Sequence, residues 1–266
     1  MNLLFVGDIF GRAGRDLVRD GLDALVAAHE IDFVIVNGEN AAGGSGITRE
    51  IGDTLFAQGV DVITSGNHIW DKKEAIDYIG AEARLLRPAN YPDAPGRGSY
   101  VARTPSGRAV GVLNLMGRVH MGGSLDDPFR AADRELAALA ERTPIVFVDF
   151  HAEATSEKIA MGWYLDGRVS AVVGSHTHVP TADARILPKG TGVVTDAGMC
   201  GPRDSVIGVE VGPVIRKFLT GMPARFTVAE KSPAVQFNSV LIDIDDATGR
   251  TRSIERVDRE WMRDGE

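Results

Sequence analysis

The chain has 266 residues, of which 44% are hydrophobic, and a formal net charge of -8. This acidic balance excludes a broad basic surface of the kind that neutralises nucleic-acid phosphates. Its apolar runs are short and soon interrupted by charged residues, so we expect neither a membrane span nor a signal-peptide core. The single cysteine, Cys200, excludes an intrachain disulfide and fits a reducing compartment, so we expect a cytoplasmic protein.

The first part of the chain alternates predicted strands and helices. Apolar runs predict strands at residues 3–6, 33–36 and 60–64. Between them, apolar residues at helical spacing predict one helix over residues 14–29 and a second that begins after Thr48, which can cap it. These strands are almost wholly apolar, as burial on both faces of a parallel sheet demands. The pattern predicts a βαβαβ unit.

The middle of the chain continues in the same way. We expect a short helix at residues 72–79, strands near residue 100 and at 110–115, and a helix that starts at Asp127. A further helix, which carries Ile159 and Trp163, is expected between two strands. Those strands are predicted at residues 145–150 and 171–173.

The last part favours a second sheet, because turns rather than helices separate most of its apolar runs. Strands are predicted at residues 184–187, 192–195, 225–229 and 235–244, with one helix near 214–219 and a loose end at 261–266. Two mixed sheets packed face to face, with helices outside, would form a four-layer αββα sandwich. No linker or repeat divides the sequence, so we expect one domain over residues 1–266.

Apolar runs along the chain repeatedly end in residues that bind metals well. The residues are Asp8, Glu39 and Asn40, Asn67 and His68, His151, and finally His176 and His178. Because the carboxyl ends of parallel strands converge on one edge of a sheet, residues far apart in sequence can meet there in one crevice. The sequence therefore predicts a site rich in imidazole and oxygen donors.

This donor set is too large for one tetrahedral zinc ion and about right for two metals that share a bridging ligand. The predicted ligands are Asp8, Glu39, Asn40, Asn67, His151, His176 and His178, with Glu39 as the natural bridge. Oxygen and imidazole donors without thiolate suit Mn, Fe or Zn, and the amide oxygens weigh against a purely zinc site.

A pair of metal ions can lower the pKa of a bridging water and clamp both the attacking and the leaving oxygen of a phosphoester. His68 lies beside the predicted ligand Asn67. We expect it to protonate the leaving alkoxide or to steady the phosphoryl oxygens. Asp71 either orients His68 or caps the next helix. Arg12 and residues 200–205 are candidates for contacting the substrate.

These motifs resemble the calcineurin-like metallophosphoesterase superfamily, whose members carry ligands after successive strands and end the set with a GHxH-type motif. The usual first motif DxH is Asp8-Ile9-Phe10 here, and the usual GDxxD is replaced by Gly38-Glu39-Asn40. Both departures look like the YmdB-type branch of cyclic-nucleotide phosphodiesterases. The supporting segments, spread over nearly the whole chain, are GDIFGRAGR, VNGENAAGG, SGNHIWDKKE, NLMGR, DFHAE and GSHTHVPTAD.

The resemblance implies that the predicted ligands hold two divalent or mixed-valence metal ions and that His68 is the proton donor. It also implies hydrolysis of 2′,3′-cyclic nucleotides and of other phosphodiesters, with iron or manganese as the metals and zinc as an alternative. Two other readings stay open: a phosphomonoesterase on the same site, and a metal- and nucleotide-binding regulatory protein with vestigial catalysis. The sequence is also compatible with a homo-oligomer.

Overall fold

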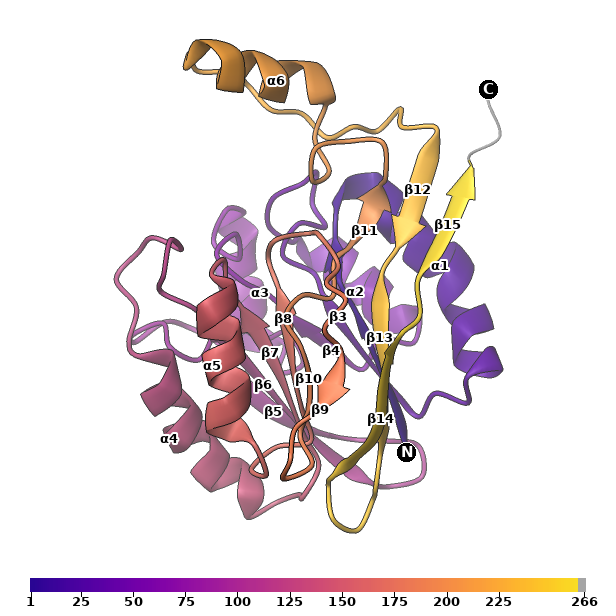
Figure 1. Cartoon of the computed structure of the whole chain (residues 1–266), viewed down its shortest axis with the longest axis vertical. Helices are drawn as coiled ribbons and strands as arrows, with labels where there is room; N and C mark the ends of the chain where they lie inside the picture. The colour runs from indigo at the N-terminus through magenta and orange to yellow at the C-terminus, as the bar shows by residue number, and fades with distance from the viewer. Residues whose placement is uncertain (263–266) are drawn as a thin grey trace.

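The computed structural model describes residues 1–262 as a mixed α/β fold with several sheets (Figure 1). The helices within this range are α1 (Gly11–Ala28), α2 (Arg49–Ala57), α3 (Lys73–Ala81), α4 (Pro128–Ala140), α5 (Thr155–Leu165) and α6 (Val211–Thr220). The first strands are β1 (Asn2–Val6), β2 (Asp8–Ile9), β3 (Phe33–Asn37), β4 (Val62–Thr64), β5 (Ser99–Arg103), β6 (Ala109–Met116), β7 (Val146–His151) and β8 (Ala171–Ser175). The remaining strands are β9 (Arg185–Ile186), β10 (Gly192–Val194), β11 (Met199–Pro202), β12 (Ala234–Phe237), β13 (Ser239–Ile244), β14 (Thr251–Arg256) and β15 (Arg259–Met262).

Two large sheets and one small sheet form the framework. The five-stranded sheet has the order β14-β13-β1-β3-β4, in which β1, β3 and β4 are parallel. The six-stranded sheet has the order β5-β6-β7-β8-β10-β9, in which β6, β7, β8 and β10 are parallel. A four-stranded sheet, β15-β12-β11-β2, completes the fold. The predicted βαβαβ unit at the start of the chain is therefore confirmed.

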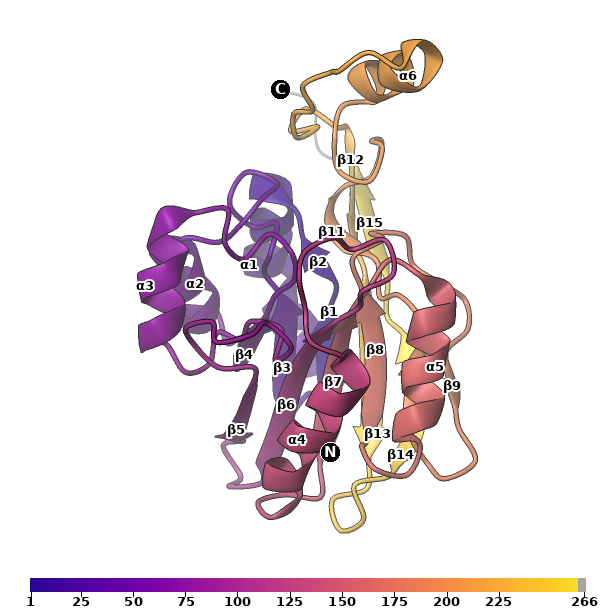
Figure 2. The same cartoon turned by 90° about the vertical axis from the view of Figure 1, so that its left-hand side faces the viewer.

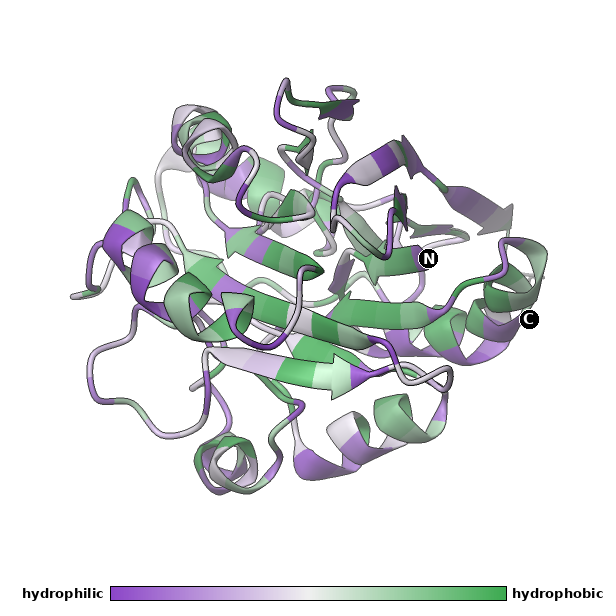
Figure 3. Cartoon of the chain, turned by 90° about the horizontal axis from the view of Figure 1, so that it is seen from below, coloured by the Kyte–Doolittle hydropathy of each residue, from purple (hydrophilic) through white to green (hydrophobic). Residues whose placement is uncertain are grey.

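The two large sheets face each other across a buried core. Phe5 and Ile35 of one sheet pack in the same cluster as Phe147 and Val173 of the other. The opposite face of the five-stranded sheet packs on α1, α2 and α3, and that of the six-stranded sheet packs on α4 and α5. Figures 1 and 2 show these helices on opposite sides of the sheets, and Figure 3 shows the hydrophobic strands between them. Burial on both faces explains why these strands are continuously apolar.

The chain passes from the five-stranded sheet to the four-stranded sheet at Gly7, between β1 and β2, and returns to the five-stranded sheet at Asn238, between β12 and β13. Gly7 N donates to the Asn238 carbonyl oxygen at 3.0 Å, and Asp8 N donates to the Gly198 carbonyl oxygen at 3.0 Å. A Cβ atom at Gly7 would overlap the Gly198 carbonyl, so only glycine allows this close approach. The crossing places Asp8 directly beyond β1.

Several helix starts follow the local rules of capping. Thr48 Oγ1 accepts from Ile51 N at 3.3 Å, and Asp127 Oδ1 accepts from Phe129 N at 2.9 Å, with Pro128 in the first turn of α4. Both predicted starts are confirmed. Among residues 1–262, no helix combines the length and the apolar character needed to cross a membrane.

Some predictions for the last part of the chain are wrong. The strand predicted at residues 225–229 is absent from the described chain, where only Val228 forms an isolated bridge, with Val209. The single strand predicted at residues 235–244 is β12 and β13, which belong to different sheets and meet at Asn238. Trp261 and Met262 are in β15 rather than in a loose end, and residues 263–266 lie outside the described residues.

Candidate metal centre

The predicted ligands lie at the carboxyl ends of parallel strands or directly after them. Asp8 is in β2, just beyond β1; Glu39 and Asn40 follow β3; Asn67 and His68 follow β4; His151 ends β7; and His176 and His178 follow β8. β1, β3 and β4 belong to one large sheet, and β7 and β8 belong to the other. The site therefore forms where the carboxyl ends of the strands of both sheets meet. This agrees with the expectation that residues at the carboxyl ends of parallel strands lie close together.

His151 is at the centre of this cluster and is fully buried. Its Nε2 lies 3.0 Å from Asn67 Oδ1, 3.2 Å from Glu39 Oε1 and 3.1 Å from His176 Nδ1. One ligand atom from each of Glu39, His151 and His176 lies within 4.8 Å of the other two. Side chains from both large sheets thus aim their donor atoms at one small volume.

Asp8 and Asn40 are further predicted ligands with buried side-chain oxygen atoms. Asp8 Oδ2 accepts from His176 N at 3.1 Å, whereas Asp8 Oδ1 lies 4.0 Å from His151 Nδ1. Among the side chains of residues 1–262, three buried atoms lack a hydrogen-bond partner: Asp8 Oδ1, Asn40 Oδ1 and, in the residue that follows α2, Gln58 Oε1. Buried oxygens without a partner are costly, so they call for a ligand such as a cation.

Each predicted histidine ligand has one ring nitrogen occupied by an acceptor outside the cluster. His178 Nδ1 lies 2.8 Å from the carbonyl oxygen of Ile207, and His176 Nε2 lies 3.2 Å from Glu153 Oε2. His151 Nδ1 lies 2.9 Å from Ser175 Oγ, which itself donates to Asp149 Oδ1 at 2.6 Å. In His176 and His178 these acceptors favour a proton on the outer nitrogen, which leaves the lone pair of the other nitrogen for a metal. The inner Nε2 of His151 faces oxygen atoms of Glu39 and Asn67, so a metal would have to replace the proton there.

Electrostatic attraction couples His151 to Glu39. Burial alone would lower the pKa of His151, but the charge and hydrogen bond of Glu39, together with the charges of Asp8 and Asp149, outweigh burial and raise the pKa to about 9. Burial would raise the pKa of Glu39, yet the charge of His151 lowers it to about 2. Burial and repulsion by His151 lower the pKa of His176 to about 3, and burial raises the pKa of Asp8 well above its usual range. A proton on His151 therefore occupies the place that a cation would fill.

His68 lies at the rim of the cluster, with 38% of its side chain exposed. Its backbone N donates to Glu39 Oε2 at 3.2 Å, and its Nδ1 lies 2.8 Å from Asp71 Oδ2. Asp71 Oδ2 also accepts from Ser45 Oγ. Lys72, not Asp71, precedes the first turn of α3. Of the two readings of Asp71, the contacts favour orientation of His68 over helix capping.

Sequence reasoning did not find the residues that support the ligands. Asp149 is buried and accepts from Asn37 Nδ2 at 3.0 Å, from Thr64 Oγ1 at 2.5 Å and from Ser175 Oγ. Asn37 and Thr64 end β3 and β4, so Asp149 of β7 also links the two large sheets. The sequence does contain one indication of this support: Asp149 is a charged residue inside the apolar run that ends at His151.

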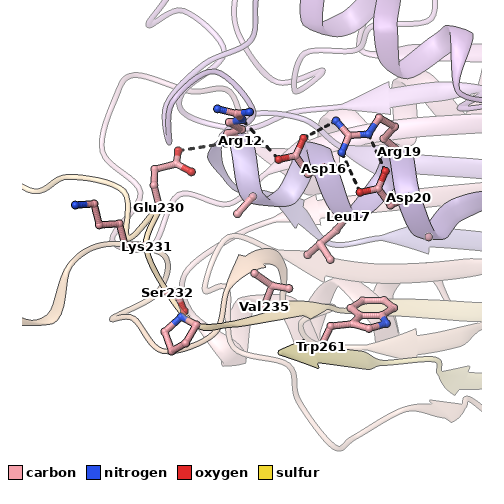
Figure 4. A pocket seen from close by; sticks show the side chains of 13 residues that line it. Arg12, Asp16, Leu17, Arg19, Asp20, Glu230, Lys231, Ser232, Val235 and Trp261 are labelled. Carbon is pink, nitrogen blue, oxygen red and sulfur yellow. Dashed lines mark hydrogen bonds and ion pairs between the residues drawn. The ribbon is translucent and has the colours of Figure 1, made fainter. Parts of the chain in front are cut away.

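Within residues 1–262, the side chains of Arg12 and of residues 200–202, candidates for contacting the substrate, form no hydrogen bond or ion pair with the predicted metal ligands. Arg12 is exposed and faces a hollow of about 1200 Å³ between α1 and β15, where Asp16 lies 3.6 Å away (Figure 4). None of the described residues lining that hollow is a predicted ligand. Residues 200–202 are buried in β11, where Cys200 pairs with Phe237, so they do not form a loop over the site. Burial also raises the pKa of Cys200, which makes its thiol unreactive.

Comparison with known proteins identifies the family. A sequence model described as YmdB-like protein matches residues 4–257. The chain belongs to the YmdB-like family. It is 50% identical over 258 residues to a 2′,3′-cyclic-nucleotide 2′-phosphodiesterase of Bacillus subtilis (strain 168), a match that covers 97% of this chain and 96% of that one.

Solved structures of other proteins share the fold of this YmdB-like chain. A hypothetical protein from Thermus thermophilus is 42% identical, with a TM-score of 0.89, over 98% of this chain and 99% of that chain. A protein described as a novel phosphatase from Mycoplasma pneumoniae is 34% identical, with a TM-score of 0.90, over 98% and 93% of the two chains. The similarity therefore extends over the whole fold.

Proposed function

We propose that the protein is a dinuclear metal-dependent phosphodiesterase that hydrolyses 2′,3′-cyclic nucleotides. The observation that carries this proposal is the orientation of His151, His176 and His178, each of which meets an acceptor with its outer ring nitrogen and so would turn the other nitrogen to a metal. The buried oxygens of Asp8 and Asn40 that lack partners add donors of the kind that a cation requires. The choice of substrate rests on the name of the Bacillus subtilis relative.

The residues that would hold the two metals are Asp8, Glu39, Asn40, Asn67, His151, His176 and His178. Hard oxygen and imidazole donors fit Fe or Mn, with Zn as an alternative. When bound, such ions would lower the pKa of a water molecule and neutralise charge on the phosphoryl oxygens. Asp149, through Ser175, holds the tautomer of His151 that this site requires.

His68 is the proposed proton donor to the leaving oxygen. Its backbone is fixed to Glu39, and its ring is oriented by Asp71, while part of the ring faces solvent where a substrate can enter. With Nδ1 directed at the Asp71 carboxylate, Nε2 is the atom that reaches the substrate. General acids of this kind contribute about 10²- to 10⁴-fold to a rate. His68→Ala should therefore lower kcat by that range and leave metal content unchanged.

The wider architecture and setting are also part of the proposal. We propose a single domain over residues 1–266 with the four-layer αββα arrangement of metallophosphoesterases, supported by the core between the two large sheets and by the helices outside each. A reducing, cytoplasmic setting is supported by the single cysteine, which is buried. The partner is a small phosphoester, and a homo-oligomer is compatible with this site.

The decisive experiment combines metal analysis with turnover in one preparation. Protein purified without added metal or chelator is expected to contain about two metal equivalents and to hydrolyse 2′,3′-cyclic AMP. Chelation should abolish turnover, and Mn²⁺ or Fe²⁺ should restore it. Glu39→Gln and His176→Ala should lose both metal and turnover while remaining folded. Protein that contains no metal and shows no metal-dependent turnover would contradict the proposal.

The same preparation separates the remaining alternatives. Turnover of bis-p-nitrophenyl phosphate and of p-nitrophenyl phosphate is compared to distinguish a phosphodiesterase from a phosphomonoesterase. The phosphomonoesterase is retained as an alternative because the related Mycoplasma pneumoniae protein is described as a phosphatase. Faster turnover of the monoester would favour the phosphomonoesterase. Two bound metals without turnover of either substrate would favour a regulatory binding protein with vestigial catalysis.

A further inference from the structure

A buried ion pair lies behind the turn that carries His176 and His178. Lys158 Nζ of α5 lies 2.6 Å from Asp196 Oδ2, just after β10, and the two side chains are only 3% and 1% exposed. Removing both charges from water is costly, and a hydrophobic pair of similar volume is often at least as stable. A general contribution to stability therefore does not account for a charged pair at this position.

The pair holds the backbone on both sides of His176. Lys158 Nζ donates to the carbonyl oxygen of Ser175 at 2.8 Å, and Asp196 Oδ2 accepts from Thr177 N at 3.1 Å. His176 and His178 have φ angles of 100° and 64°, in a region that residues with a Cβ rarely adopt. Such conformations persist only where the surrounding structure enforces them.

Asp196 also links this turn to the segment that carries Asp8. Its Oδ1 accepts from Gly198 N at 2.8 Å, and the Gly198 carbonyl oxygen accepts from Asp8 N at 3.0 Å. Asp8 Oδ2 in turn accepts from His176 N, so these hydrogen bonds form a closed ring from Asp196 through Gly198 and Asp8 back to the turn at His176. One carboxylate therefore connects ligand-bearing segments that belong to two different sheets.

We propose that Lys158 and Asp196 are positioning residues that set His176 and His178 relative to Asp8 so that all three can bind the same metals. This inference rests on the metal site of the proposed function. Groups that orient metal ligands typically change metal affinity by about 10- to 100-fold when they are removed. Loss of the pair should therefore weaken metal binding by that range, independently of its effect on folding.

The test uses Co²⁺ as the probe on chelated full-length protein. Lys158→Met/Asp196→Ala removes both charges together, so no lone buried charge remains, and it deletes both carboxylate acceptors. Lys158→Met/Asp196→Asn keeps one acceptor oxygen and is expected to be intermediate. The control is Thr191→Val, a buried hydrogen-bonding residue at the opposite end of β10, whose Oγ1 donates to the Val169 carbonyl oxygen. Co²⁺ affinity, the Co²⁺ absorption spectrum and the thermal midpoint of the metal-free protein are measured for each.

The proposal predicts about 10- to 100-fold weaker Co²⁺ binding and an altered spectrum for Lys158→Met/Asp196→Ala. Thr191→Val should bind Co²⁺ as the wild type does, even if its metal-free midpoint falls equally. Wild-type affinity and spectrum in the double variant would overturn the inference, as would an equal loss in Thr191→Val. If the wild-type protein itself binds no Co²⁺, the proposed function fails first, and the two failures are thus distinguishable.

Discussion

At the scale of single residues, the pairing of His151 with Glu39 makes the metal-free protein sensitive to pH. The folded pKa of His151 is raised from 6.5 to about 9. A raised pKa adds stability that is fully present below about 6.5 and is lost as pH rises through about 9. We therefore expect the free energy of unfolding of chelated protein to fall by a few kcal/mol across this range, as measured by urea denaturation.

The His151→Gln variant is the control for this pH dependence. His151→Gln removes the titrating imidazole, so the free energy of unfolding of the chelated variant should fall less between pH 6.5 and 9 than that of the wild type. Saturating metal should remove the His151 contribution, because the metal takes the place of the proton. A stability that is constant or increases between pH 6.5 and 9 in chelated wild-type protein would contradict the assignment.

Asp71 connects Ser45 to the ring of His68 and so holds the orientation of that ring. Asp71→Asn should leave the ring less well oriented and lower kcat on 2′,3′-cyclic AMP about tenfold with little change in KM. The loss should be smaller with bis-p-nitrophenyl phosphate, whose leaving group needs no proton. Steady-state kinetics on both substrates measure the difference.

Asp53→Asn is the matched control for Asp71→Asn. The Asp53 carboxylate accepts from the Tyr78 hydroxyl at 2.9 Å, between α2 and α3 and away from the predicted ligands. It should leave both rates near those of the wild type. Equal losses on the two substrates in Asp71→Asn would mean that Asp71 supports the fold rather than the proton donor.

At the scale of elements, the turn after β4 requires a glycine. A Cβ atom at Gly66 would overlap the His151 ring and the Glu39 carboxylate. Overpacking of this kind typically costs about 1 to 3 kcal/mol. Gly66→Ala should therefore remain folded with lower stability and lose metal by displacing ligands from two strands, as measured by denaturation and by metal content.

Gly80→Ala in the neighbouring helix α3 is the control for Gly66→Ala. A Cβ atom there meets nothing within 4 Å, so Gly80→Ala should be neutral or raise stability by about 0.5 to 1 kcal/mol. Metal content should not change. Full metal content in Gly66→Ala would show that the ligands tolerate displacement, in disagreement with the geometry at the end of β4.

The elements also show which parts of the fold a sequence reveals. β3 is buried along its whole length, and its continuous apolar run predicts it without tertiary information. β14 has one large apolar residue, Ile254, and most of its side chains are at least partly exposed. β15 is wholly exposed, so neither strand has the continuous apolar run that marks a buried strand. The run at residues 235–244 gave one predicted strand, because the break between sheets at Asn238 depends on a distant partner, Gly7.

The same limit applies to the site. Glu39 and His151 can be predicted as site residues from the sequence because each follows an apolar run at the end of a strand. Ser175 looks like an ordinary turn residue and Lys158 like an exposed lysine on a helix, yet both are buried and bond to residues far away in sequence. Their roles depend on contacts between strands and helices that local patterns do not contain.

At the scale of the whole molecule, the proposed metals would join the two large sheets. Glu39 and Asn67 come from one sheet, and His151 and His176 come from the other. Ligand binding to the folded state alone adds about 2.7 kcal/mol when free metal is a hundredfold above the dissociation constant. For a chain of this size, that corresponds to a rise of roughly 5 to 10 °C in the thermal midpoint.

Hydrogen exchange locates this stabilisation. With metal bound, amides near the carboxyl ends of β3, β4, β7 and β8 should exchange more slowly, because ligands from both sheets become fixed together. Amides at the opposite ends of the same strands, which the apolar core between the sheets already holds, should change little. His176→Ala serves as the control and should lose the protection at both edges. If chelation accelerated exchange at the ends of β3 and β4 but not of β7 and β8, the metals would belong to one sheet, and the bridging arrangement would be wrong.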